Sequence, residues 1–150
     1  MKLNTLLTDK GYAVIRLKKI STNHFELKAK LNGVNGRFIL DTGASNSCVH
    51  ISLSAKFKLD LKDSDTKAAG AGAIGMETKL AEGNTLQLAK WKFTNAAIVL
   101  LDLSHVNTAL TEHSASPVDG IIGADILEKG KAIIDYKKRK LYLKKVIFKY

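Results

Sequence analysis

Apolar and polar residues alternate in the first part of the chain. The alternation runs over residues 12–18 and 24–31, so that each segment has one apolar and one polar face. This period of two is typical of half-buried β-strands. Asn32-Gly33 and Asn35-Gly36 follow, and both are turn signals because Asn and Gly tolerate positive φ. The pattern therefore predicts two strands and then tight turns.

The rest of the chain is predicted to alternate short strands with short helices. Further strands are expected at residues 37–40, 47–51, 86–101 (two strands, with Trp91 and Phe93 on one face), 132–136 and 140–143. Helices are expected at residues 52–59, capped by Ser52, at 103–113 and at 124–129. No repeat or break in composition marks a second domain, so we expect one domain over 1–150 with a core at about 12–145. The predicted class is mainly β, a small closed barrel.

The amino-acid composition excludes several classes of protein. With 45% hydrophobic and 25% charged residues, the chain matches an ordinary globular domain and not a disordered one. No apolar run approaches the roughly 20 residues that cross a bilayer, and no signal peptide is readable at the N-terminus. We therefore expect a cytoplasmic location and no membrane partner. The single cysteine, Cys48, excludes a disulfide framework within the chain and a Cys-rich metal site.

The net charge of +10 raises the question of a nucleic-acid partner. The densest basic run, residues 137–140, falls in a predicted hairpin turn, and Lys144, Lys145 and Lys149 follow on the next strand. Such a run is typical of a solvated edge that resists aggregation. Because no nucleic-acid-binding motif accompanies it, we do not expect nucleic acid as a partner.

One short stretch carries the candidate chemistry. The apolar residues 38–40 lead directly into Asp41-Thr42-Gly43, and Ala44 and Ser45 follow. A strand that ends in this way brings a carboxylate to a tight turn. Gly43 permits close approach of the backbone there, and the Thr42 hydroxyl is a candidate to lock the turn by hydrogen bonding.

Two further segments extend this pattern. Ile121-Ile122-Gly123 precedes the helix expected at 124–129, and a Gly-rich apolar segment, residues 68–76, lies between it and Asp41. In this order the three elements resemble those of the retropepsins and their single-domain bacterial relatives among the aspartic peptidases. The resemblance runs from about residue 31 to 143. It implies a retropepsin-like closed barrel with a flap hairpin and one or two short helices, and no metal or organic cofactor.

The resemblance also implies a function, an aspartic endopeptidase that binds its polypeptide substrate as an extended strand. Peptide hydrolysis by this route needs two carboxylates about 3 Å apart that share one proton. The chain holds one Asp-Thr-Gly, so the second carboxylate would be Asp41 of an identical partner in a homodimer. The flap and pocket residues implied are Gly70, Gly72, Ile74, Gly75, Met76, Val118 and Ile121. The alternative is a dimeric module of the same fold that binds peptides without cleaving them.

The other acidic residues and the histidines have interpretations of their own. Asp119 is the rival for the second carboxylate within one chain, although as a turn residue it would accept backbone N–H groups. Asp125 is predicted to be the N-cap of the helix at 124–129. The four histidines show no metal-ligand spacing, so we expect each on the surface or in a strand. Cys48, beside apolar Val49, is predicted to be a buried and inert thiol.

Some positions depart from the retroviral pattern. Retroviral members carry an acidic residue where Ser45 stands and an arginine where Ala124 stands, so their ion pair is missing and we expect a weak dimer. The apolar residues 146–148 and Tyr150 are candidates for strand pairing at the interface. Ala44 lacks the hydroxyl of many acid-optimum relatives, so we expect an activity optimum from mildly acidic to neutral pH.

Overall fold

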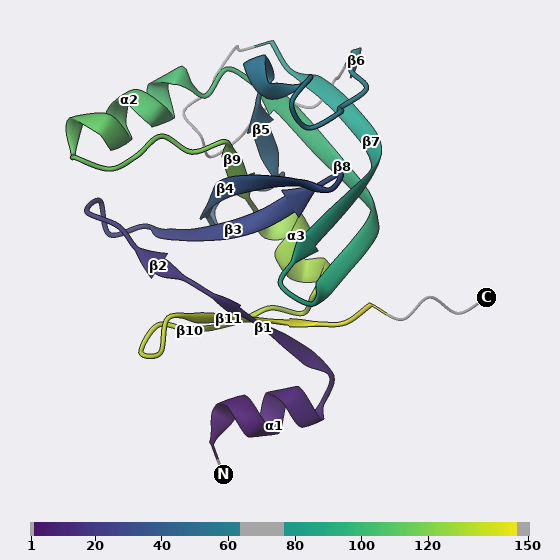
Figure 1. Cartoon of the computed structure of the whole chain (residues 1–150), viewed down its shortest axis with the longest axis vertical. Helices are drawn as coiled ribbons and strands as arrows, with labels where there is room; N and C mark the ends of the chain where they lie inside the picture. The colour runs from purple at the N-terminus through teal and green to yellow at the C-terminus, as the bar shows by residue number, and fades with distance from the viewer. Residues whose placement is uncertain (1, 64–76, 147–150) are drawn as a thin grey trace.

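The fold is built from eleven strands and three short α-helices in the part of the chain that the computed structural model describes, residues 2–63 and 77–146. Figure 1 shows their arrangement. In chain order the elements are α1 (Leu3–Asp9), β1 (Tyr12–Arg16), β2 (Lys18–Lys19), β3 (Phe25–Leu31), β4 (Val34–Leu40), β5 (Cys48–His50), a 3-10 turn (Ile51–Leu53), β6 (Lys62–Asp63), β7 (Lys79–Leu88), β8 (Trp91–Leu101), α2 (Ser104–Glu112), β9 (Gly120–Ile122), α3 (Ala124–Lys129), β10 (Ile133–Asp135) and β11 (Lys140–Lys144).

The larger sheet closes into a barrel. Its strand order is β2-β3-β4-β9-β5-β8-β7-β6, and a further pairing joins β3 to β7 through Lys30↔Gln87 and Leu31↔Leu86. The strands β3, β4, β9, β5, β8 and β7 therefore form a closed ring. Each of these strands has a partner on both sides, so the ring has no unpaired edge strand. The predicted mainly-β closed barrel is confirmed.

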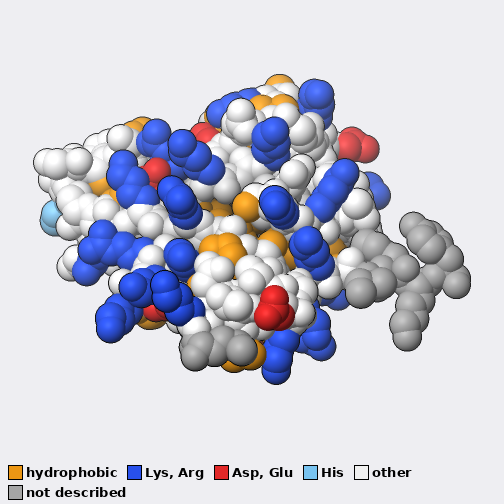
Figure 2. All heavy atoms as spheres, turned by 60° about the horizontal axis from the view of Figure 1, so that its bottom comes forward, with side chains coloured by type: hydrophobic (Ala, Val, Ile, Leu, Met, Phe, Trp, Pro, Cys, Tyr) orange, Lys and Arg blue, Asp and Glu red, His pale blue; other side chains and the backbone are white. Residues whose placement is uncertain are grey.

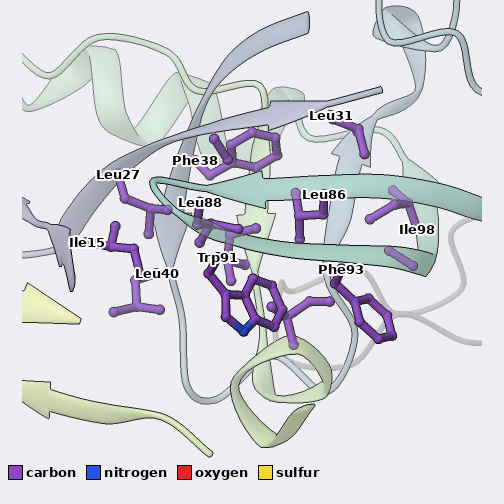
Figure 3. Close-up of a cluster of buried hydrophobic side chains, with 14 of the residues drawn as sticks. Ile15, Leu27, Leu31, Phe38, Leu40, Leu86, Leu88, Trp91, Phe93 and Ile98 are labelled. Carbon is purple, nitrogen blue, oxygen red and sulfur yellow. The ribbon is translucent and has the colours of Figure 1, made fainter. Parts of the chain in front are cut away.

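The barrel surrounds an apolar core, part of which Figure 3 shows in close-up. Trp91 is fully buried and Phe93 nearly so, and their rings stack with centroids 6.0 Å apart. This confirms the prediction that alternation places both rings on one face of the strand. The Trp91 indole N–H donates to the Lys144 carbonyl at 2.9 Å, so the core is tied to the neighbouring sheet.

That second sheet has three strands in the order β1-β11-β10 and lies below the barrel in Figure 1. The predicted final hairpin is confirmed, because β10 and β11 pair antiparallel from Ile133↔Tyr142 to Asp135↔Lys140. Helix α1 lies against β1 and buries Leu7. Sequence patterning did not predict α1, because seven residues with one buried apolar position show too little periodicity.

One predicted turn is wrong. The chain reverses at Asn32-Gly33, whose φ values of 51° and 81° suit a tight hairpin turn, whereas Asn35-Gly36 lies within β4. Gly36 is there because of packing: a Cβ at this position would lie 2.8 Å from the Phe38 ring and 2.9 Å from the Phe57 ring. The glycine therefore makes room for two aromatic rings and does not mark a turn.

The helix predicted at residues 52–59 is also wrong. The chain forms a 3-10 turn at Ile51–Leu53 and then further turns, with Lys58 at a φ of 54°. Phe57 and Leu59 are both buried, and in an α-helix two residues so spaced would point about 200° apart. Irregular turns allow both side chains to enter the core. The helices expected at 103–113 and 124–129 are confirmed as α2 and α3.

Candidate active site

Asp41 stands at the place where two parallel strands end. β4 pairs parallel with β9, with Phe38 beside Gly120 and Leu40 beside Ile122. The Asp41 N–H extends this ladder by donating to the Ile122 carbonyl at 3.0 Å. The apolar strand predicted before Asp41 is thus confirmed, and its partner is the segment at Ile121-Ile122-Gly123.

The turn after Asp41 is held by backbone groups. The Ala44 N–H donates to the Asp41 carbonyl at 3.2 Å, and the Gly43 N–H donates to Asp41 Oδ1 at 2.9 Å. A Cβ on Gly43 would lie 3.3 Å from the same oxygen, so the residue allows the close approach that we expected. The exposed Thr42 hydroxyl makes no hydrogen bond to any described residue, and the predicted hydroxyl lock is therefore not what holds the turn.

A second set of hydrogen bonds joins this loop to the start of α3. Asp125 Oδ1 accepts from the Ser47 N–H at 2.9 Å and from the Ser47 hydroxyl at 2.7 Å. The Gly123 N–H donates to Ser47 Oγ at 2.8 Å, and the Ala124 N–H donates to the Ala44 carbonyl at 2.7 Å. The loop is thereby attached to α3 by both side-chain and backbone groups.

The predicted role of Asp125 as N-cap is wrong. Gly123 precedes the helix as its N-cap, and Asp125 lies within the first turn. Its carboxylate accepts one helical N–H, that of Ile126 at 2.9 Å, but its other bonds go to Ser47 on the neighbouring loop. A glycine is needed before it because a Cβ at residue 123 would lie 2.6 Å from the Ala44 carbonyl oxygen.

A cavity of about 650 Å³ opens beside Asp41. Its walls come from the turn before β3, the end of β4, helix α2 and β9. The residues that line it are Ser21, Thr22, Asn23, His24, Ile39, Asp41, His105, Val106, Ala109, Leu110, His113 and Ile121. Ser21 Oγ donates to the His113 carbonyl at 2.6 Å, which ties the turn before β3 to the end of α2 on the left of Figure 1.

Sequence reasoning missed the histidines of this cavity. His24, His105 and His113 are exposed, as expected, but they also line one cavity together with Asp41. Because His24 is far from the other two in the chain, no motif could signal the grouping. The one available hint was that His105 and His113 fall eight residues apart in a predicted helix and so lie on roughly the same side.

The other predicted pocket and loop residues differ in position. Ile121 lines the cavity, whereas Val118 is buried behind the wall against Ile39 and Leu110. Ala44 is buried and Ser45 is exposed. The predicted flap residues Gly70, Gly72, Ile74, Gly75 and Met76 lie outside the described residues, so their role stays a prediction.

Asp119, the rival carboxylate, has other partners. Its Oδ2 accepts from the Arg37 N–H at 2.9 Å and lies 3.6 Å from Lys56 Nζ. Its neighbour Gly120 pairs with Phe38, so Asp119 lies beside a part of β4 that precedes Asp41 by four residues, or about 13 Å of strand. Asp119 lines a different cavity, with Arg37 and Pro117. The prediction that it accepts a backbone N–H is confirmed.

Cys48 is buried, as predicted. Burial raises the pKa of its thiol to about 12, so the side chain stays protonated and inert at ordinary pH.

Within residues 2–63 and 77–146, no group of three or more His, Cys, Asp or Glu side chains is placed to hold a metal ion. None of the helices in the same ranges has both the length and the apolar composition needed to cross a membrane.

A family model and several solved structures that resemble this chain are all of aspartic proteases. Residues 27–126 match the family model described as aspartyl protease. A retropepsin-like aspartic protease from Rickettsia conorii aligns with a TM-score of 0.59 at 23% identity, covering 89% of this chain and 90% of that one. The EIAV protease complexed with the inhibitor HBY-793 aligns with a TM-score of 0.54 at 20% identity, covering 73% and 90%.

A third solved structure agrees with these two. The retroviral protease-like domain of Ddi1 from Leishmania major aligns with a TM-score of 0.55 at 17% identity, covering 81% of this chain and 88% of that one. No significant match was found among curated protein sequences. At these identities the structural matches establish the fold, and the predicted retropepsin-like barrel is confirmed.

Proposed function

Since the chain belongs to the aspartyl protease family, we propose that it is an endopeptidase whose active site is shared between two copies. Each copy contributes Asp41. One carboxylate activates a water molecule as general base, and the other polarises the peptide carbonyl while the pair shares one proton. The substrate lies as an extended strand across both copies and is recognised by main-chain hydrogen bonds and side-chain pockets.

The observation that carries this proposal is the position of Asp41. It is the one carboxylate among the described residues that line the 650 Å³ cavity, and the Gly43 N–H holds one of its oxygens. Asp119 is engaged with Arg37 and Lys56, so it is poorly placed to act as the second acid. A twofold axis supplies the missing group, because it brings identical surfaces of two copies together.

The first test replaces Asp41 by Asn, which keeps the shape of the side chain and removes its charge. We expect Asp41→Asn to abolish cleavage of a peptide library while the circular dichroism spectrum and the melting temperature stay near those of the wild type. Activity near the wild-type level would reject the mechanism.

A mixing experiment then tests the sharing of the site. At fixed total concentration, wild type is mixed with inactive Asp41→Asn protein and allowed to exchange subunits. If each site needs one Asp41 from each copy, an equal mixture retains about one quarter of the wild-type activity, because only wild-type pairs are active. If each chain held a complete site, the equal mixture would retain about one half of the wild-type activity. That result would contradict the shared site.

A further inference from the structure

The cavity beside Asp41 has an apolar floor and a polar rim. Of its apolar lining residues, Ile39, Leu110 and Ile121 are buried and form its floor, and Val106 is half-buried. The exposed lining residues, which form its rim, include the three histidines and Ala109. At about 650 Å³ it lies within the range of small-ligand pockets and has room for a long side chain. A group that fills it needs an apolar stem and a polar end.

The three histidines reach the rim from two elements. His24 follows the turn before β3, where its Nδ1 lies 2.7 Å from Thr22 Oγ1. His105 lies in the first turn of α2 and His113 directly follows the helix. The bond from Ser21 Oγ to the His113 carbonyl holds the two elements together. The imidazoles therefore belong to one connected wall.

The charges around this wall favour an anion. Imidazole is the side chain that gains a positive charge in mildly acidic solution, and the whole chain carries a net charge of +10. Asp41 is the one carboxylate among the described lining residues. The acidic neighbours of the wall along the chain are Asp102 before α2 and Glu112 at its end.

Asp102 is already engaged with other groups. The pKa of its carboxyl is lowered mainly by hydrogen bonds from Ser104, with smaller contributions from His50 and His105. The carboxylate of Asp102 interacts with His105 and offsets part of its attraction for an anion, so the pull on an anion comes from the three imidazoles together.

We propose that this cavity is a specificity pocket for a glutamate side chain next to the cleaved bond of the substrate. The apolar floor holds the aliphatic stem of the glutamate, and the imidazoles at the rim hold its carboxylate. Glutamine has nearly the same shape without the charge, leucine lacks the polar end, and lysine carries the opposite charge. The inference rests on the proposed function, because it assigns the cavity to the substrate of Asp41.

The test compares peptides that differ at one position beside the cleaved bond, with Glu, Gln, Leu or Lys there. At about pH 5.5 a free glutamate is ionised and a free imidazole is protonated. We expect kcat/KM for the Glu peptide to exceed that for the Gln peptide by about tenfold, the usual size of a charge-assisted hydrogen bond.

The variant His105→Gln/His113→Gln should lower the Glu-to-Gln ratio several-fold, because two of the three imidazoles are removed. His50→Gln is the matched control: it removes the fourth histidine, which does not line the cavity. The control should leave the ratio unchanged. An equal fall of the ratio in both variants would overturn the assignment of the cavity.

A binding measurement separates this inference from the proposed function. Inactive Asp41→Asn protein is titrated with the Glu and Gln peptides in a calorimeter. Tighter binding of the Glu peptide supports the pocket even if the wild type cleaves nothing, in which case the proposed function alone fails. Equal binding of both peptides, or cleavage that favours Leu, overturns the glutamate pocket and leaves the proposed peptidase standing.

Discussion

Ser47 and Asp125 join two segments that retroviral proteases join by an ion pair. At the positions of that pair this chain has Ser45 and Ala124, which cannot form it. Instead, one oxygen of Asp125 accepts both the N–H and the hydroxyl of Ser47. Ser47 is buried, so its polar groups depend on this partner. Within one chain, the loop is therefore joined to α3 by residues other than 45 and 124.

Removing the carboxylate should loosen this link. We expect Asp125→Ala to lower the free energy of unfolding by about 2–3 kcal/mol, because it leaves two donors of Ser47 and the Ile126 N–H without their acceptor. Peptidase activity should fall as well, since the loop carries Asp41. Urea denaturation measures the first effect. Asp135→Ala is the control: that carboxylate accepts one backbone N–H in an exposed turn, and its loss should cost less than about 1 kcal/mol. Equal costs would contradict the account.

Ala44 offers a second test at the level of one residue. A hydroxyl that donates to a carboxylate favours its charged form and so lowers its pKa. If the hydroxyl of Ala44→Ser reaches the carboxylate pair, the acidic limb of the pH–activity profile moves to lower pH. We expect that shift, measured as kcat/KM from about pH 3 to 8. Because Ala44 is buried among apolar side chains such as Cys48 and Ile121, some loss of stability should accompany it. An unchanged limb would show that residue 44 does not tune the pair.

At the level of elements, local patterns predicted more than long-range pairings did. Alternation identified β3, β8 and the last residues of β7, because each has one face in the core, whereas the apolar run at 38–40 marked the end of β4. The first part of β7, before residue 86, was not predicted. The parallel pairs β4–β9 and β5–β8 could not be predicted, since a strand pattern carries no information about its partner. The turns after β5 were predicted as a helix, and that prediction failed. Phe57 and Leu59 are both buried because irregular turns direct them into the core, and their spacing does not follow the period of a helix. For the site, the Asp-Thr-Gly motif identified Asp41, whereas the histidines came together only through the fold.

The close pairing of β5 and β9 leads to a prediction about Gly120. A Cβ at this residue would overlap the Cys48 carbonyl oxygen and lie 2.9 Å from the Phe38 ring. We expect Gly120→Ala to destabilise the protein by about 2–3 kcal/mol, the usual cost of overpacking a core. Gly83→Ala is the comparison: it has open space around it, but its φ of 71° suits glycine, so the cost should be near 1 kcal/mol. Thermal unfolding of both variants tests the order, and a larger loss for Gly83→Ala would refute it.

At the level of the whole molecule, basic side chains are spread over the surface. In Figure 2 Lys and Arg side chains cover much of the visible face, and few acidic ones accompany them. The run that includes Lys137, Lys138 and Arg139 lies in the exposed turn between β10 and β11, which confirms its predicted position. A positive field of this kind favours acidic partners in general, and it agrees in sign with the pocket proposed beside Asp41.

Association is the property of the whole molecule on which the proposed activity depends. We expect specific activity to fall when the protein is diluted through its dimer dissociation constant, because each copy supplies one Asp41. Without the retroviral ion pair, this fall should begin at a relatively high concentration. Sedimentation and activity are measured over the same dilution series, with and without a peptide-like inhibitor, which should favour the dimer. Full activity from a monomer at every concentration would contradict the shared site. Asp119 would then again be the candidate for the second carboxylate within one chain.

The bond between Ser47 and Asp125 also has a consequence for the order of events during synthesis. The two residues are 78 positions apart, and the strand that supports Asp41 from the side, β9, comes from the same late part of the chain. A ribosome that has made the Asp-Thr-Gly loop has therefore not yet made the groups that hold it in shape. A growing chain carries this carboxylate without its scaffold until β9 and α3 have been made. The loop that carries Asp41 can therefore take its final shape only after residue 125 has been added.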